Sequence, residues 1–207
     1  MKLLFPLLSI LFFSFCSCSS TNEFNRKSNQ KAKDLMSLHL KNINIYVGND
    51  SAKELISDIK ESVELYESIS LVKSHREYQM EEFVMPLRFN ISDWTEFYNL
   101  NKDNVYLDKN KVIKFKNASI YLEKNPVDYL NSFVNDLDKM IFEKNLRAQE
   151  FDYIIEKLEV VTKLECNDNK FDLEDLNKCV FAWKNWINEN SSKLYWNKGT
   201  QEVIAKY

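Results

Sequence analysis

Residues 125–141, NPVDYLNSFVNDLDKMI, contain the signals of a complete helix. The Asn125 side chain can accept backbone N–H groups at a helix start, and Pro126 fits the first helical position, where no N–H is needed. Apolar residues then recur every three or four positions, namely Val127, Leu130, Phe133, Val134, Leu137 and Ile141. This spacing predicts an amphipathic helix over 126–144.

Two further segments toward the C-terminus have the same periodicity. The spacing predicts helices over 148–164 and 173–190, and Asp172 is placed to cap the second of them. Short polar links separate the three helices. Helices joined in this way pack as antiparallel neighbours, so we expect a C-terminal three-helix antiparallel bundle.

The upstream half contains weaker helix and strand signals. Ser51 and Glu54 form a capping box, and the apolar spacing that follows predicts a helix over 52–70. A short helix is expected over 31–41, and the alternating run 42–47 favours a strand. Ser92 or Asp93 is expected to cap one further helical turn.

The middle of the chain favours a small β element. Short β-branched and aromatic runs, separated by Asp and Asn, predict a hairpin or three-strand meander at about 105–122. Only two glycines and three prolines occur in 207 residues, where average usage gives about 14 and 10. Barrels, sandwiches and glycine-rich phosphate loops are therefore disfavoured. The expected fold is a single, mainly α domain over 34–207.

The first twenty residues, MKLLFPLLSILFFSFCSCSS, have the order of a secretory signal. One positive residue, Lys2, precedes an apolar run, and small polar residues follow it. The run from Leu3 to Phe15 is shorter than the roughly 20 residues that a membrane-spanning helix requires. A cleaved signal over 1–17 is therefore favoured over a retained transmembrane anchor.

The residues Phe15-Cys16-Ser17-Cys18 resemble the lipobox of bacterial lipoprotein precursors. The usual pattern has an aliphatic residue in place of Phe15 and more often a small residue in place of Cys16. The resemblance implies that Cys18 is acylated and anchors the mature chain in a bilayer, with Cys16 as the minority alternative. The implied location is the cell membrane or outer membrane, facing the periplasm or the surface. The alternative is an ordinary cleaved signal and a secreted protein.

The polar segment 18–33 is expected to be a flexible tether between anchor and domain, because it has almost no apolar residues. Two cysteines remain downstream, Cys166 and Cys179. A disulfide between them would close a loop of about 14 residues, and two free, buried thiols are the alternative. No histidine accompanies them, so no metal site is expected.

Trp183-x-x-Trp186-x-x-x-Asn190 and Leu194-x-Trp196 resemble the terminal segment of some bacterial HEAT-like helical repeat proteins. No internal repeat precedes them, so the resemblance implies only how these residues pack. Trp183, Trp186 and Trp196 are candidates for binding a partner or for the hydrophobic core.

No motif of enzyme chemistry is present in the sequence, and no cofactor is expected. The net charge is −3 without a basic stripe, which argues against nucleic acid as a partner. The favoured hypothesis is a membrane-anchored lipoprotein that binds another envelope or secreted protein, in one version as an immunity-type protein. The alternatives are a self-assembling structural envelope protein and a hydrolase, for which His75 and Glu77 are the first candidates.

Overall fold

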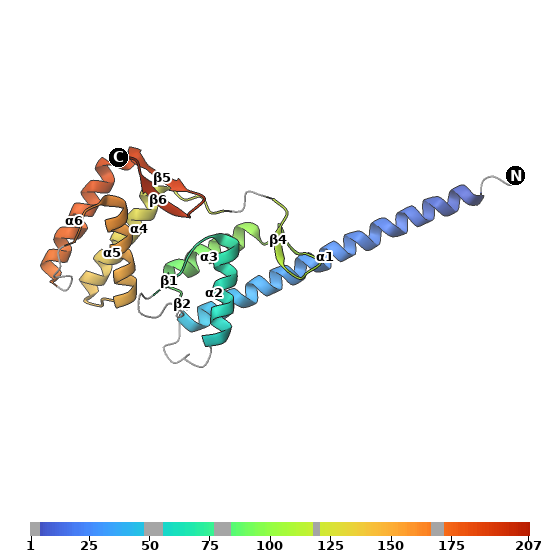
Figure 1. Cartoon of the computed structure of the whole chain (residues 1–207), viewed down its shortest axis with the longest axis horizontal. Coiled ribbons are helices and arrows are strands. Elements are labelled where there is room, and N and C mark those ends of the chain that lie inside the picture. Colours follow the sequence, from blue (N-terminus) through green and yellow to red (C-terminus); the bar gives the residue numbers. More distant parts are fainter. Residues whose placement is uncertain (1–4, 48–55, 77–83, 118–120, 167–171) are drawn as a thin grey trace.

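A computed structural model describes residues 5–47, 56–76, 84–117, 121–166 and 172–207. The described chain is mainly helical, as the sequence predicts (Figure 1). The helices are α1 (Phe5–Val47), α2 (Ile56–Ser70), α3 (Arg88–Asn101), α4 (Pro126–Glu143), α5 (Ala148–Thr162) and α6 (Leu173–Glu189). The strands form antiparallel pairs: β1 (His75–Arg76) with β2 (Val84–Met85), β3 (Val105–Leu107) with β4 (Ile113–Phe115), and β5 (Leu194–Asn197) with β6 (Glu202–Ala205).

The C-terminal helices begin where the sequence predicts. Asn125 Oδ1 accepts the backbone N–H groups of Val127 and Asp128, and Asp172 Oδ1 accepts that of Glu174. The helices α4 and α5 end at Lys144 and Lys163, which have left-handed φ values of 52° and 59°. Where a helix ends in a left-handed residue, that residue is usually glycine, so lysine at both ends fits the scarcity of glycine in the chain.

The order of the three helices differs from a simple up-and-down bundle. Helix α4 is antiparallel to both partners: its first turn meets Trp196, which follows α6, and lies near Val161 at the end of α5. Helices α5 and α6 are therefore parallel to each other. The described part of the link, 163–166, runs back along α6, since Trp183 Nε1 donates to the Leu164 carbonyl and Cys166 is bonded to Cys179.

Two groups of buried side chains form the hydrophobic interior. The C-terminal core lies among α4, α5, α6 and the β5–β6 pair, and includes Phe133, Leu137, Ile154, Leu158, Trp183 and Ile187. The N-terminal core lies among α1, α2, α3 and the β3–β4 pair, and includes Met36, Ile43, Val63, Tyr66, Trp94 and Phe97. Trp196 packs against both cores and so links them at the junction.

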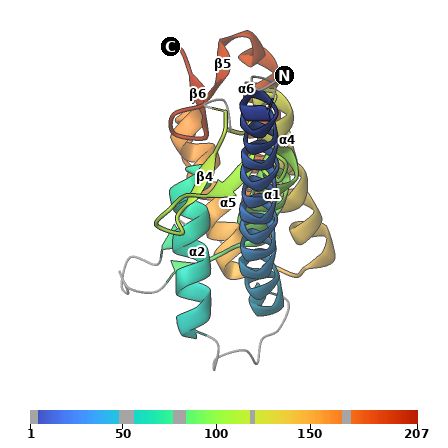
Figure 2. The same ribbon diagram turned by 90° about the vertical axis from the view of Figure 1, so that its right-hand side faces the viewer.

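Helix α1 corrects the prediction for 42–47. This segment is helical and not a strand, because Ile43 continues the buried stripe that Met36 and Leu40 begin. The alternation in 42–47 favours a strand locally, but packing against α2 determines the outcome. Figure 2, viewed nearly along α1, shows α2 beside it, as does Figure 1.

The expected tether over 18–33 also differs from the structure, where it lies within α1. Ser28 Oγ donates to the Leu107 carbonyl at 2.7 Å, and Lys33 Nζ is 2.6 Å from Asp103 Oδ1. Ala32 is fully buried. The end of the polar segment is thus part of the folded domain. Ser28 contacts β3 and Lys33 pairs with a residue after α3, whereas the side chains of Asn25, Arg26, Gln30 and Lys31 are exposed.

Helix α3 begins at Arg88, four or five residues before its predicted cap at Ser92 or Asp93. Asn90 Oδ1 accepts the backbone N–H of Leu87, so Asn90 supplies the cap from inside the helix. Pro86 precedes this cap. Asp93 is left in the helix interior, on the buried face beside Trp94.

The predicted hairpin is present as β3–β4, with Val105 opposite Phe115. Its turn uses no glycine, because Asp108 Oδ1 accepts the N–H groups of Asn110 and Val112. The third strand of the alternative meander is absent at Tyr121 and Leu122, and 118–120 lie outside the described residues. The predicted capping box at Ser51 and Glu54, with the start of the helix over 52–70, also lies outside them.

Candidate functional site

A small cavity lies at the junction of the two cores. Its volume is about 80 Å³, room for a few water molecules. Polar and charged groups enter it from both sides: Asp93 comes from α3, Tyr129 from α4, Tyr153 and Lys157 from α5, and Gln201 and Glu202 from the β5–β6 pair. Pockets between structural units are frequent ligand sites, so this junction is the first candidate for function.

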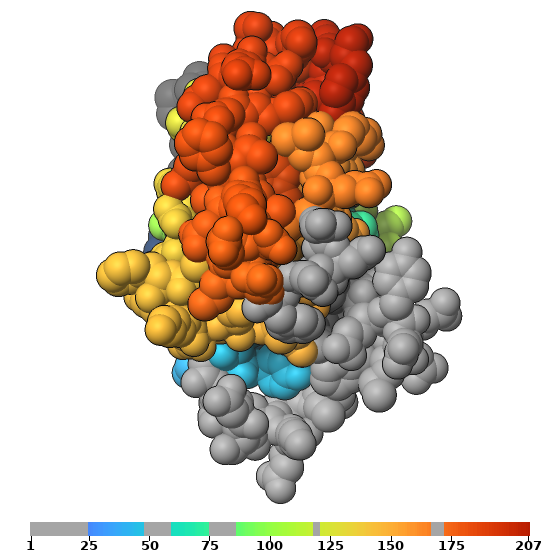
Figure 3. Space-filling view, turned by 90° about the vertical axis from the view of Figure 1, so that its left-hand side faces the viewer, coloured from blue at the N-terminus to red at the C-terminus, as the bar shows by residue number. Residues whose placement is uncertain are grey.

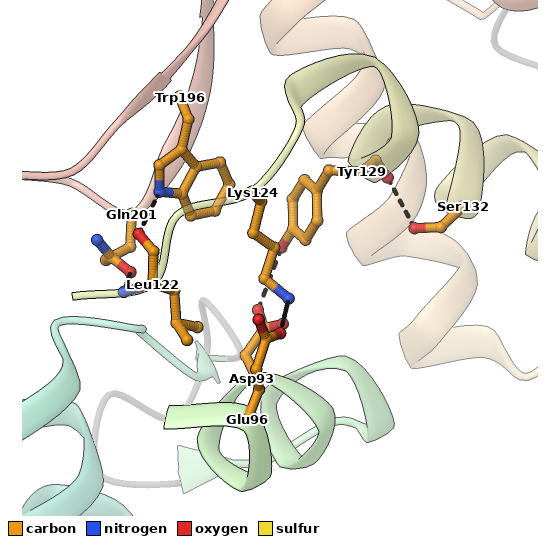
Figure 4. A network of polar contacts seen from close by, with 8 residues as sticks. All are labelled: Asp93, Glu96, Leu122, Lys124, Tyr129, Ser132, Trp196 and Gln201. Atoms are coloured by element: carbon orange, nitrogen blue, oxygen red, sulfur yellow. Dashed lines mark hydrogen bonds and ion pairs between the residues drawn. The ribbon is translucent and has the colours of Figure 1, made fainter. Parts of the chain in front are cut away.

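Asp93 is the central group of the junction, and only 5% of its surface is exposed. Lys124 Nζ lies 2.6 Å from Asp93 Oδ1 and 2.7 Å from Glu96 Oε2. On the other side, the Tyr129 hydroxyl donates to Asp93 Oδ2 at 3.3 Å (Figure 4). The carboxylate therefore binds both a lysine of the segment that precedes α4 and a tyrosine of α4 itself.

Burial and ion pairing act on Asp93 in opposite directions. Burial raises the pKa of the Asp93 carboxyl, and this outweighs the lowering effect of Lys124. Burial by itself would lower the pKa of Lys124, but Asp93 and Glu96 outweigh it and raise that pKa. Both directions mean that the pair holds its protons more tightly than isolated groups do. For Asp93 the cause is the cost of an anion at a buried site, and for Lys124 it is the neighbouring carboxylates of Asp93 and Glu96.

The two tyrosines extend this network into the cavity. Burial, followed by the charge of Asp93, raises the pKa of both Tyr129 and Tyr153, so both hydroxyls remain protonated hydrogen-bond donors. Lys124 Nζ also lies 5.4 Å from the centre of the Tyr129 ring, and Lys157 Nζ lies 5.6 Å from that of Tyr153. The ring faces are therefore already occupied by ammonium groups of the chain itself.

The segment that precedes α4 is held at Leu122, two residues before Lys124. Trp196 Nε1 donates to the Leu122 carbonyl at 2.8 Å, and Gln201 Oε1 accepts the Leu122 N–H at 3.2 Å (Figure 4). These bonds are long-range in sequence and join the β5–β6 pair to the segment before α4. The charged and polar groups of this junction therefore bind one another. Its ionised groups neutralise each other and hold the two cores together.

The tryptophans singled out in the sequence occupy different environments. Trp183 is 1% exposed and belongs to the C-terminal core, so its surface is not available to a partner. Trp186 is half-buried, and its ring centre lies 6.5 Å from that of Tyr207. Trp196 is half-buried in the junction, with its ring 5.1 Å from that of Tyr129. The structure thus uses all three in packing.

Of the cysteines, Cys166 and Cys179 form a disulfide with Cα atoms 5.8 Å apart. The other two, Cys16 and Cys18, lie in the part of α1 whose side chains are not described. Among the described residues there is no group of three or more His, Cys, Asp or Glu side chains that could hold a metal ion.

The hydrolase candidates are not brought together by the described part of the chain. His75 is in β1 without a described side chain, and Glu77 lies outside the described residues. A different pair meets instead: His39 Nδ1 lies 2.8 Å from Ser62 Oγ. Ser62 is fully buried between α1 and α2, so a substrate cannot reach its hydroxyl. This contact is a packing hydrogen bond of the N-terminal core.

Sequence reasoning missed the Asp93 network. One local signal was available: Asn90, Asp93, Trp94, Phe97 and Asn101 recur at helical spacing, which places Asp93 on the apolar face of one continuous helix. A carboxylate on such a face requires a partner. No local pattern, however, identifies that partner as Lys124, 31 residues away.

Comparisons with known proteins found no matching family model, no matching curated protein and no matching solved structure. Within the described ranges, no helix combines the length and the apolar character needed to cross a bilayer. The functional account therefore rests on the residues of this chain and their arrangement.

Proposed function

We propose that this chain is a lipid-anchored envelope protein that binds another protein through its folded domain. The observation that carries the proposal is the N-terminal sequence, in which an apolar run from Leu3 to Phe15 leads to Ser17-Cys18. Two acyl chains hold a protein on a membrane for long periods where one does not. The implied attachment at Cys18 would therefore keep the domain at the bilayer.

The disulfide supports the location. Disulfides persist in extracytoplasmic compartments such as the periplasm and are rare in the cytosol of most organisms. The Cys166–Cys179 bond therefore fits a chain that is exported before it folds. This argument holds both for a lipid-anchored protein and for the secreted alternative.

Exposed aromatic side chains support a binding role. Phe142 on α4 is 87% exposed and Phe181 on α6 is 66% exposed. Large aromatic side chains that become buried in a complex contribute much of the binding energy of protein interfaces. In the version in which the partner is a basic protein, the net charge of −3 would steer association, and the complex would weaken as salt is added.

Site-specific photo-cross-linking tests this proposal. A photo-reactive residue at Phe142 or Phe181, in the full chain in its native envelope, is expected to give a discrete adduct with another protein. The control position is Asp103, which is 76% exposed and polar, and no adduct is expected there. Adducts between two copies of the chain would instead favour the self-assembling alternative. Adducts at neither aromatic position would contradict binding through these side chains.

A further inference from the structure

The disulfide fastens one segment onto the surface of the C-terminal bundle. Cys166 lies in the link that follows α5, and Cys179 lies in the middle of α6. Trp183 Nε1 also donates to the Leu164 carbonyl oxygen at 3.4 Å. The covalent bond and this hydrogen bond both join 163–166 to α6. Figure 3 shows α6 at the surface of this face of the molecule.

An open groove lies beside this bond. Its volume is about 530 Å³, and Lys163, Leu164, Lys178, Cys179 and Trp183 are among the residues that line it. The two bonded cysteines differ in access. Cys179 is half-buried and lines the groove, whereas Cys166 is 6% exposed and is not among the lining residues. A small thiol in the groove can therefore approach the sulfur of Cys179 but not that of Cys166.

The charges at the groove permit a thiolate to approach. A thiolate is the attacking species in disulfide exchange, and nearby ammonium groups favour it. Lys163 and Lys178 line the groove, and Glu165 and Asp175 line it too, so the local charge is balanced and not repulsive. Lys178 is paired with Glu174 and Asp175, and Lys163 lines the same groove.

We propose that Cys179 is a thiol-exchange site and that the Cys166–Cys179 bond is a reversible clasp. A thiolate of an external low-molecular-weight thiol attacks Sγ of Cys179, forming a mixed disulfide, and the S–S bond breaks to release Cys166 as a thiolate that takes a proton from water. A second thiolate then attacks the sulfur of the external thiol, giving the oxidised external disulfide and a free Cys179. The net reaction consumes two thiols and reduces one disulfide.

Opening the clasp has a structural consequence. The link 163–166 loses its covalent attachment to α6, while the Cys166 N–H still donates to Glu159 Oε1 in α5. Trp183, 1% exposed in the oxidised chain, borders the same groove and becomes accessible as the link moves away. The redox state thereby controls an aromatic surface on α6. This inference concerns the fold itself and does not depend on the proposed function.

Two single-cysteine variants of the full chain test the difference in access. Cys166→Ser keeps the thiol in the groove, and Cys179→Ser keeps the buried one. With oxidised glutathione in native buffer, we expect the mixed disulfide to form at least about tenfold faster at Cys179 than at Cys166, because reactivity follows exposure. Peptide mass mapping separates these sites from Cys16 and Cys18. Equal rates, or faster reaction at Cys166, would overturn the assignment.

A second measurement uses the wild-type chain, so its result does not depend on whether a variant folds. Reduced glutathione is added at several urea concentrations below the unfolding transition, and the rate of Cys166–Cys179 reduction is followed by alkylation and peptide mass. Attack through the groove predicts a rate nearly independent of urea. A rate that rises steeply with urea would mean that the bond is reached only after unfolding, and the proposal would be wrong.

Discussion

Replacing Trp94 by alanine is expected to lower the free energy of unfolding by about 3–5 kcal/mol, the usual cost of removing a large buried aromatic side chain. Trp94 is fully buried in the N-terminal core. Its Nε1 donates to the Val72 carbonyl at 3.3 Å, and its ring lies 5.7 Å from that of Tyr66. Since α2 and α3 meet at this ring, its loss leaves a cavity that neither helix can close. Urea unfolding followed by circular dichroism measures the change.

Two controls separate the cavity from other effects. Trp94→Phe keeps most of the apolar ring and loses the hydrogen bond, so a loss of roughly 1–2 kcal/mol is expected. Leu100→Ala removes a side chain that is 58% exposed on the same helix, and it should change stability by less than about 0.5 kcal/mol. An alanine variant at Trp94 that is as stable as the Leu100 variant would refute this packing of the N-terminal core.

Replacing Lys124 by methionine is expected to destabilise the junction by about 3–5 kcal/mol near pH 7, because it leaves a buried carboxylate without its counter-ion. The Lys124 side chain is 16% exposed and the Asp93 side chain is 8% exposed, so solvent screens the pair only weakly. Glu96→Gln is the matched control. It removes the other carboxylate that Lys124 binds, but the Glu96 side chain is 45% exposed, so the expected loss is below about 1 kcal/mol.

The effect of Lys124→Met should depend on pH with a definite sign. Burial already raises the pKa of the Asp93 carboxyl in the folded chain. The contribution of Asp93 to the free energy of unfolding therefore falls as the pH rises from the pKa of the unfolded chain through the raised pKa of the folded chain. Without Lys124 that pKa rises further, and the loss of stability extends to higher pH. The variant should therefore be closest to wild type in acid and furthest from it at neutral pH. If the variant and the wild type differ in stability by the same amount in acid and at neutral pH, Asp93 does not carry an uncompensated charge in the variant.

The part of the fold that the sequence predicts well is the part where local patterns and packing agree. In α4, the Asn125 cap, Pro126 and the apolar spacing all point to the same helix, and the structure contains it. In 42–47, the alternation of Ile43, Ile45 and Val47 favours a strand, but one buried stripe shared with Met36 makes the segment helical. Helical packing against α2 outweighs a short local preference.

The junction could not be predicted in the same way. Asp93, Lys124 and Tyr129 come from three separate segments, and their meeting depends on how the two cores pack. The return of the link along α6 was missed for a similar reason. The short, polar composition of 163–172 favours an antiparallel turn, whereas the disulfide joins Cys166, shortly after α5, to Cys179 in the middle of α6.

The proposed lipid anchor at Cys18 can be tested by the intact mass of the protein. The protein is purified from its native membrane beside two variants, Cys18→Ala and Cys16→Ser. The account predicts a wild-type mass equal to Cys18–Tyr207 plus acyl groups, the same mass in the Cys16 variant, and no acylated product in the Cys18 variant. An unmodified wild-type mass, or acyl groups that survive Cys18→Ala, would contradict it.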